Sequence, residues 1–165
     1  MMETLYYFPV GLILTYILTT CLVFKQVPKS ISNTHYMWKE KGLNYLFTFV
    51  IWATGVPILI YWLSITPQCY QFLPFVSVAA MCFVGAACAF KETLTGAVHY
   101  TSAGIWAAAA VLYFVLLGQW QCLLMGALFA AIGFALDSGK HFTFWAEMAC
   151  VLAMIMGIGA IGGIF

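Results

Sequence analysis

The sequence predicts an all-α integral membrane protein: one domain over residues 1–165, built as a bundle of six transmembrane helices. Composition points to this class first, because 65% of the residues are apolar and only 7% are charged, whereas a soluble domain carries about 25% charged residues. The mean hydropathy of +1.02 agrees. The uncharged blocks between the charges are also long enough to cross a bilayer, which takes about 20 apolar helical residues.

The same composition excludes several classes of protein. So few charged residues rule out a soluble enzyme and a disordered chain. The chain has six Lys and no Arg, so it lacks the basic patch that nucleic acid requires. A membrane β-barrel would show alternating segments of about ten residues. The apolar runs here are continuous and longer, which favours helices.

The charges and turn residues divide the chain into spans. The first block ends before Lys25, and the block over 42–90 is interrupted by a polar turn with a helix-stopping proline, Pro67. The block over 93–136 is interrupted at Gly118, and the last block contains one acid, Glu147. The predicted spans lie near 5–24, 43–65, 72–90, 96–117, 120–136 and 142–164, of which the fifth is the shortest.

The segment 25–42 is predicted to be an interfacial loop with a short helix over 34–41. Ser and Asn precede this helix as capping residues. Aromatic residues beside Lys39 and Lys41 suit a segment at the level of the lipid headgroups. Two interpretations stay open: an ordinary connector, or a gate that recognises a substrate.

Orientation follows from the lysines. Six spans place the loops 25–42, 91–95 and 137–141 on one side, and these loops hold every Lys of the chain. Because Lys-rich short loops stay in the cytosol, we expect these loops to be cytosolic and both termini to lie outside. A bacterial inner membrane is the expected location, with the lipid bilayer as the first partner.

A polar site is predicted at the cytosolic ends of the helices. His99 and Glu147 are ionisable residues inside spans, and such residues are functional candidates because their burial in lipid is costly. Both lie about one to one and a half turns from the cytosolic edge, so they could face each other. The other candidates at this end are Glu92, Ser102, Asp137 and His141.

Three functional hypotheses fit this pattern. The first is a small transporter- or channel-like protein for a small ion or molecule, coupled to protons or cations and needing no cofactor. The second is an intramembrane metal-dependent hydrolase acting on lipid, in which His99, His141 and Glu147 hold Zn²⁺. The third is a non-catalytic subunit or sensor that works through helix contacts, with the polar residues only locking helices together.

Small residues predict close helix packing. Gly159 and Gly163 form a GxxxG pair, and Gly126 and Ala130 have the same spacing. Such residues let helix backbones approach closely. The spacing allows packing within the chain or contact between the subunits of a homo-oligomer.

The six cysteines show no metal-ligand spacing. Cys69 and Cys122 both fall at the outer face in the predicted topology. Because that face is oxidising in a bacterial periplasm, a disulfide between them is a further prediction.

Overall fold

The computed structural model describes residues 2–89 and 92–165, with the backbone alone for residues 89 and 92–95. Helices account for 80% of the structure, and the described residues form no strand. The all-α prediction is therefore confirmed. The helices are α1 (Thr4–Phe24), α2 (Thr34–Lys39), α3 (Leu46–Ile65), α4 (Phe72–Ala86), α5 (Glu92–Leu116), α6 (Trp120–Leu136) and α7 (Phe142–Ile161), with the 3₁₀ turns η1 (Gln68–Tyr70) and η2 (Ala87–Ala89) beside α4.

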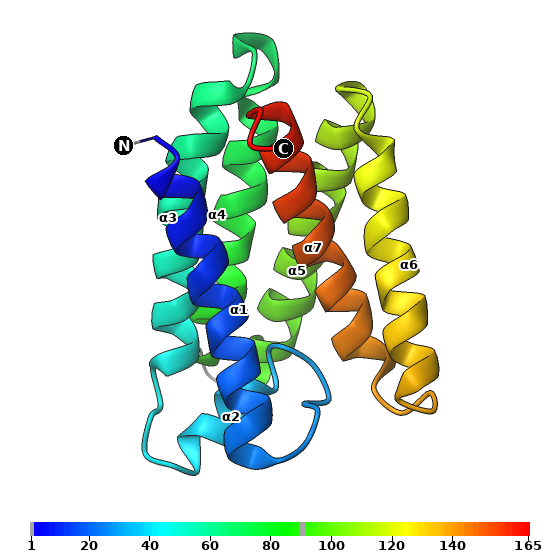
Figure 1. The fold of residues 1–165 in the computed structure, drawn as a ribbon. Helices are drawn as coiled ribbons and strands as arrows, with labels where there is room; N and C mark the ends of the chain where they lie inside the picture. The colour runs from blue at the N-terminus through cyan, green and yellow to red at the C-terminus, as the bar shows by residue number, and fades with distance from the viewer. Residues whose placement is uncertain (1, 90–91) are drawn as a thin grey trace.

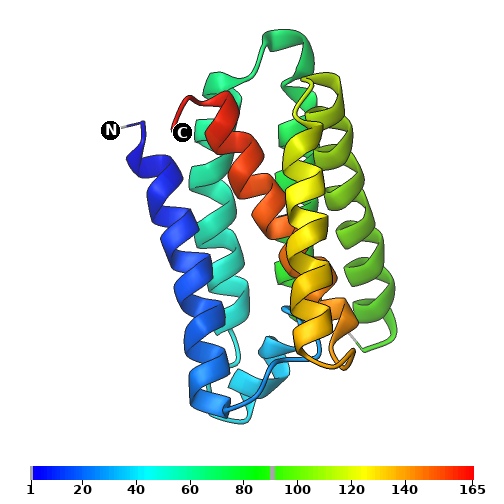
Figure 2. The ribbon, with the colours of Figure 1, turned by 45° about the vertical axis from the view of Figure 1, so that its right-hand side comes forward.

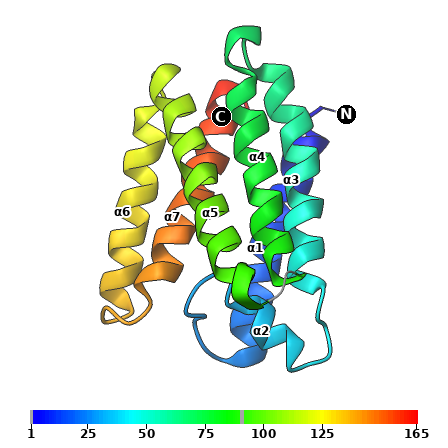
Figure 3. The ribbon, with the colours of Figure 1, turned by 180° about the vertical axis from the view of Figure 1, so that it is seen from behind.

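The six longer helices run up and down in a bundle, and α2 lies across one end of it (Figure 1). Both chain termini lie at the other end. The end with α2 also holds the α6–α7 turn and the described lysines, as the view from behind shows (Figure 3). We call it the Lys-bearing end.

Within the part of the chain that the structure describes, five helical segments are long and apolar enough to cross a membrane: α1, α3, Gln68–Ala86, Gly96–Leu116 and α7. The sixth, α6, is apolar but has 17 residues. The sequence predicted a span over 72–90. In the structure the α-helix of this span, α4, ends at Ala86, and the chain continues as the 3₁₀ turn η2. The predicted span from 96 begins earlier, because α5 starts at Glu92.

Helix packing divides the bundle into two groups. The helices α1, α3, α4 and α5 pack in sequence order, each on the next. The helices α6 and α7 pack mainly on each other, and α7 touches α5 at few positions. Figure 2 shows α7 crossing the bundle obliquely beside α6.

Glycines bring α6 and α7 together. A Cβ added at Gly126 would lie 2.6 Å from the carbonyl oxygen of Ala149, and Gly133 lies against the Trp145 ring. Ala130, between them, is half-buried. The sequence prediction selected Gly126 and Ala130 but missed Gly133, which contacts an aromatic ring of the neighbouring helix.

The other predicted glycine pair does not form a shared packing face. Gly159 lies in α7 and contacts the side chains of Tyr6 and Phe165. Gly163 lies beyond the end of α7, with φ of 66° and no atom within 4 Å of an added Cβ. Its positive φ serves the helix terminus, where glycine avoids steric strain.

Aromatic side chains fill the bundle at the end that holds the termini. Trp62, Tyr113 and Phe114 each have 0% exposure. The Trp62 ring packs edge-on against Tyr113, with centroids 5.0 Å apart, and stacks on Phe114 at 5.8 Å. Tyr6 and Tyr61 complete this group, with their ring centroids 5.5 Å apart. We call these five residues the aromatic plug.

The loop at the Lys-bearing end is fixed to α1 by side-chain hydrogen bonds. The Tyr16 hydroxyl donates to Thr34 Oγ1 at 2.7 Å, and the Trp38 indole donates to Thr20 Oγ1 at 2.8 Å. The short helix expected over 34–41 is present as α2 and ends at Lys39. These contacts hold the loop in place over one mouth of the bundle.

Candidate functional site

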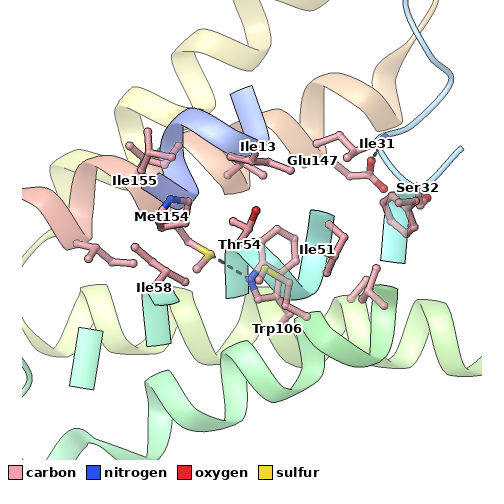
Figure 4. A pocket seen from close by; sticks show the side chains of 18 of the residues that line it. Ile13, Ile31, Ser32, Ile51, Thr54, Ile58, Trp106, Glu147, Met154 and Ile155 are labelled. Carbon is pink, nitrogen blue, oxygen red and sulfur yellow. Dashed lines mark hydrogen bonds between the residues drawn. The ribbon is translucent and has the colours of Figure 1, made fainter. Parts of the chain in front are cut away.

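Two adjacent cavities lie in the bundle toward the Lys-bearing end. The outer one, which we call the vestibule, has a volume of about 560 Å³. The inner one, the chamber, has a volume of about 110 Å³ and lies among α1, α3, α4, α5 and α7 (Figure 4). Five residues line both cavities and define the neck between them: Ser32, Phe47, Val84, His99 and Glu147.

The chamber is mainly apolar. Its walls carry aliphatic side chains such as Ile13, Ile51 and Ile155, together with methionines (Figure 4). Two polar groups lie inside it, beyond the neck. The Thr54 hydroxyl oxygen is buried, with no hydrogen-bond partner in the described part of the chain. The Trp106 indole donates to the sulfur of Met154 at 3.0 Å.

The vestibule is more polar. Lys29 and Lys39 are exposed on its wall, and His35 is 8% exposed at its edge. Burial, and then the charge of Lys39, lower the pKa of His35 below its ordinary value of 6.5. The imidazole is therefore mostly neutral at pH 7. Its Nδ1 is buried without a partner among the described residues.

Glu147 joins α7 to the loop that precedes α2. The Ile31 amide donates a hydrogen bond to Oε2 of Glu147, and the Ser32 amide lies beside the same carboxylate. Backbone N–H groups satisfy carboxylate oxygens well, since hydrogen bonds to an ionised acceptor are the stronger kind. The carboxylate therefore acts as a latch between α7 and the loop.

His99 on α5 and Glu147 on α7 both line the two cavities. No hydrogen bond joins these two side chains among the contacts of the described residues. The structure thus brings the two residues to one neck, and it gives the Glu147 carboxyl group the Ile31 amide as its partner in place of the direct pair with His99 that the sequence suggested.

Asp137 and His141 form a separate group at the α6–α7 turn. His141 Nδ1 lies 2.5 Å from Asp137 Oδ2, and the Trp145 indole donates to the same oxygen at 3.2 Å. Burial alone would raise the pKa of Asp137, but the hydrogen bonds from His141 and Trp145 outweigh it and hold the pKa below its usual value. This group stabilises the turn and lines neither the chamber nor the vestibule.

The predicted six-residue site is therefore divided. His99 and Glu147 meet at the neck, whereas Asp137 and His141 pair elsewhere. Ser102 is half-buried on α5 and lines neither cavity. The Glu92 side chain lies outside the described residues.

The predicted zinc ligands do not come together. In the described part of the chain, no three His, Cys, Asp or Glu side chains are close enough to share a metal ion. His141, one member of the predicted set with His99 and Glu147, is held by Asp137 instead. Zn²⁺ takes at least three protein ligands in a catalytic site, so these residues as placed do not fit that metal.

The cysteines expected to form a disulfide lie at the end that holds the termini. Cys69 is exposed in η1, and Cys122 is buried in the first turn of α6. Both are free thiols in this structure. The disulfide stays a prediction for an oxidising environment.

The two polar residues inside the chamber differ in how far the sequence indicates them. Trp106 follows His99 at a seven-residue spacing, so the sequence places both on one helix face, although it does not indicate a chamber there. Thr54 gave no such signal, because a single hydroxyl in an apolar span usually bonds to its own helix.

Comparison with known proteins gives no match. No family model, curated protein sequence or solved structure corresponds to this chain.

Proposed function

We propose that this chain is a small transporter-like membrane protein that takes a solute from its Lys-bearing end into the chamber. The observation that carries this proposal is that the two cavities lie next to each other and share the five residues of the neck. At the far end the aromatic plug fills the bundle. A cavity open to one side and closed to the other is the arrangement of a carrier in one of its access states.

The chamber lining favours a carrier over an ion channel. An ion inside a membrane is stable only where polar groups or water replace its hydration shell. Beyond the neck the chamber offers an ion little beyond Thr54 and the Trp106 indole. The solute is therefore an apolar or amphiphilic small molecule. Coupling to a proton would act at the neck, where His99 and Glu147 are the two ionisable side chains.

We infer that all six long helices cross the membrane. At 1.5 Å per residue, α6 is about 26 Å long, and 17 residues is the lower limit for a span. Six crossings place every lysine on one side, which by the Lys bias is the cytosol of a bacterial inner membrane. The vestibule would then open to the cytosol.

The packing of α6 and α7 supports a moving part. The backbones of these helices approach each other closely and approach the remaining helices at few positions, such as the contact of Gly157 with the Phe114 ring. Carriers commonly expose their site to alternate sides by rocking one helix group against another. The chamber lies on the boundary between the α6–α7 hairpin and the other helices, where such a motion would open it.

The two alternatives have weaker support. A zinc hydrolase requires His99, His141 and Glu147 in one place, and His141 is engaged by Asp137. A non-catalytic subunit leaves the adjacent cavities without a role. A homo-oligomer remains compatible with a carrier and has no specific contact in its favour.

The test is sided labelling of the chamber. Ala103 lines the chamber, whereas Ala108 on the same helix is exposed on the outside of the bundle, where lipid would lie. Ala103→Cys and Ala108→Cys are each made in a chain whose six native cysteines are replaced by Ser or Ala. Both are reconstituted in liposomes and treated with a small, membrane-impermeant thiol reagent from either side.

A carrier predicts that Ala103→Cys reacts quickly from the Lys-bearing side and slowly from the opposite side, as the site alternates. Ala108→Cys should react from neither side. Reaction of Ala103→Cys from the Lys-bearing side alone would identify a one-sided binding protein and overturn the proposal. Absence of reaction from both sides would show that the chamber is not reached from water.

A further inference from the structure

The Thr54 hydroxyl is an unused hydrogen-bonding group inside the chamber. Thr in a helix usually donates to the carbonyl four residues earlier, as Thr20 and Thr66 do here. Thr54 Oγ1 is buried and makes no such bond within the described residues. A buried hydroxyl without a hydrogen-bond partner destabilises the folded protein by about 1–3 kcal/mol. A ligand in the chamber that accepts a hydrogen bond from Thr54 would remove this penalty.

A second polar group in the chamber has a weak partner. The Trp106 indole N–H donates to Met154 Sδ at 3.0 Å, across the space between α5 and α7 (Figure 4). Thioether sulfur is a poor acceptor, and methionine is a flexible side chain. An oxygen atom entering the chamber would displace the sulfur at little cost. The chamber therefore offers two donors, Thr54 and Trp106, that no protein oxygen satisfies.

The size of the chamber limits its occupant. Its volume of about 110 Å³ is slightly below that of an engineered 150 Å³ cavity that binds benzene. One hydrocarbon chain or one small ring fits, and a two-chain lipid does not. An ordered water is a poor alternative, since a buried water takes about three hydrogen bonds and the chamber beyond the neck offers it only the Thr54 hydroxyl and the Trp106 indole (Figure 4).

We propose that the chamber binds the oxygen-bearing end of an elongated, neutral and otherwise apolar molecule, whose one acceptor is a hydroxyl or a carbonyl. The Thr54 hydroxyl donates a hydrogen bond to that oxygen. The Trp106 indole either donates to the same oxygen in place of the Met154 sulfur or keeps its hydrogen bond to the sulfur. The rest of the molecule extends through the neck toward the vestibule. This inference rests on the proposed function and names its substrate class, that of single-chain alcohols and ketones.

The experiment uses two matched photoreactive probes. One is an eight-carbon aliphatic diazirine with a terminal hydroxyl, and the other is the same molecule without it. The purified protein in lipid nanodiscs is irradiated with increasing probe, and saturable labelling is mapped by mass spectrometry. Met81 and Met154 on the chamber wall report the site, and labelling that does not saturate reports lipid contact.

The wild type should be labelled saturably in the chamber, at about three- to tenfold lower concentration of the hydroxylated probe, the ratio that one net hydrogen bond provides. Thr54→Val keeps the shape of the side chain and should remove this preference. Thr54→Ser keeps the hydroxyl and should retain it. Trp106→Phe, which removes the indole donor, distinguishes one donor from two.

Equal affinity for the two probes, an unchanged preference in Thr54→Val, or no saturable labelling of the chamber would each overturn the inference. Its failure is distinct from failure of the proposed function. If Ala103→Cys reacts from both sides while the probes do not label the chamber, the carrier stands and the substrate class is wrong. If the probes label the chamber and access is one-sided, the ligand class stands and transport is wrong.

Discussion

The two ends of the bundle use the same kinds of residue and reach opposite results. At the end that holds the termini, Trp62 and Tyr113 have 0% exposure and line neither the chamber nor the vestibule. At the Lys-bearing end, Phe47 and Ile51 are also buried, yet they line an open cavity. Apolar composition alone therefore does not decide whether a membrane bundle is filled or hollow.

The difference lies in how large and small residues face each other. In the aromatic plug, Phe114 lies against Gly157 and Tyr61 against Gly162, so each ring fits where a glycine makes room. Such interdigitation gives the density of a close-packed interior. Along the chamber, aliphatic side chains such as Ile13 and Ile155 instead line an open space. Buried polar atoms without a partner among the described residues occur at both ends, as Thr54 Oγ1 in the chamber and Trp62 Nε1 in the plug.

The largest expected effect compares truncations at the two ends. Trp62→Ala should lower the free energy of unfolding by about 3 kcal/mol or more, because it opens a cavity in a filled region. Phe47→Ala should cost clearly less, because its ring already borders a cavity and its removal only enlarges that space. Equilibrium unfolding in mixed detergent micelles measures both values. Equal losses would contradict the contrast between a filled and a hollow end.

A second comparison tests close packing with glycines. Gly157→Val should destabilise the protein by about 2 kcal/mol, because the added atoms meet the Phe114 ring. Gly104→Val is the matched control in a helix, since an added Cβ there has nothing within 4 Å. Thermal unfolding of the purified variants shows the difference. A tolerated Gly157→Val would mean that the plug is loosely packed.

A third comparison concerns the latch at the open end. Glu147→Gln keeps the shape but removes the charge, and a hydrogen bond to a neutral acceptor is weaker than one to a carboxylate by about 1 kcal/mol. The Ile31 amide should therefore exchange its hydrogen about fivefold faster, because local opening governs exchange. Thr143→Val, which lines the vestibule without contacting this amide, serves as the control. An unchanged exchange rate of the Ile31 amide in Glu147→Gln would show that Glu147 does not hold the loop in place.

The smallest effect is expected at the α6–α7 turn. The pKa of Asp137 is lower in the folded protein than its usual value of 3.8. Its contribution to stability is therefore fully present above about pH 4 and is lost as the pH falls through the lowered value. Hydrogen exchange of the turn amides should speed up below pH 4 in the wild type, after correction for the intrinsic rate. Asp137→Asn should show no such step, and a step of the same size in this variant would assign the effect to another group.

The sequence indicated how far along each helix a residue lies. It did not indicate which neighbouring helix the side chain of that residue faces. Uncharged blocks locate the helices because charges and polar turns interrupt apolar spans, and the observed helix bounds follow these interruptions, as at the turn that contains Pro67. Depth likewise placed His99 and Glu147 near each other. Depth does not say which way a side chain points, so Asp137 and His141 were grouped with them although the two pair at the α6–α7 turn.

Two features could not be read from the sequence for physical reasons. Glu147 bonds to a backbone amide of the loop, and every residue except proline has such an amide, so no side-chain pattern marks the partner. The chamber arises from the way side chains of five helices meet. Helix order and rotation are needed to predict it, and hydropathy constrains neither.

The most direct test of the account is the sidedness of two native cysteines. Cys88 lines the vestibule and Cys69 is exposed at the opposite end of the bundle. Intact cells and inverted membrane vesicles are treated with a small, membrane-impermeant maleimide, and the labelled peptides are identified by mass spectrometry. The account predicts that Cys69 reacts in intact cells and Cys88 in inverted vesicles. Labelling of both cysteines from the same side would contradict the six-span topology and the cytosolic opening of the vestibule.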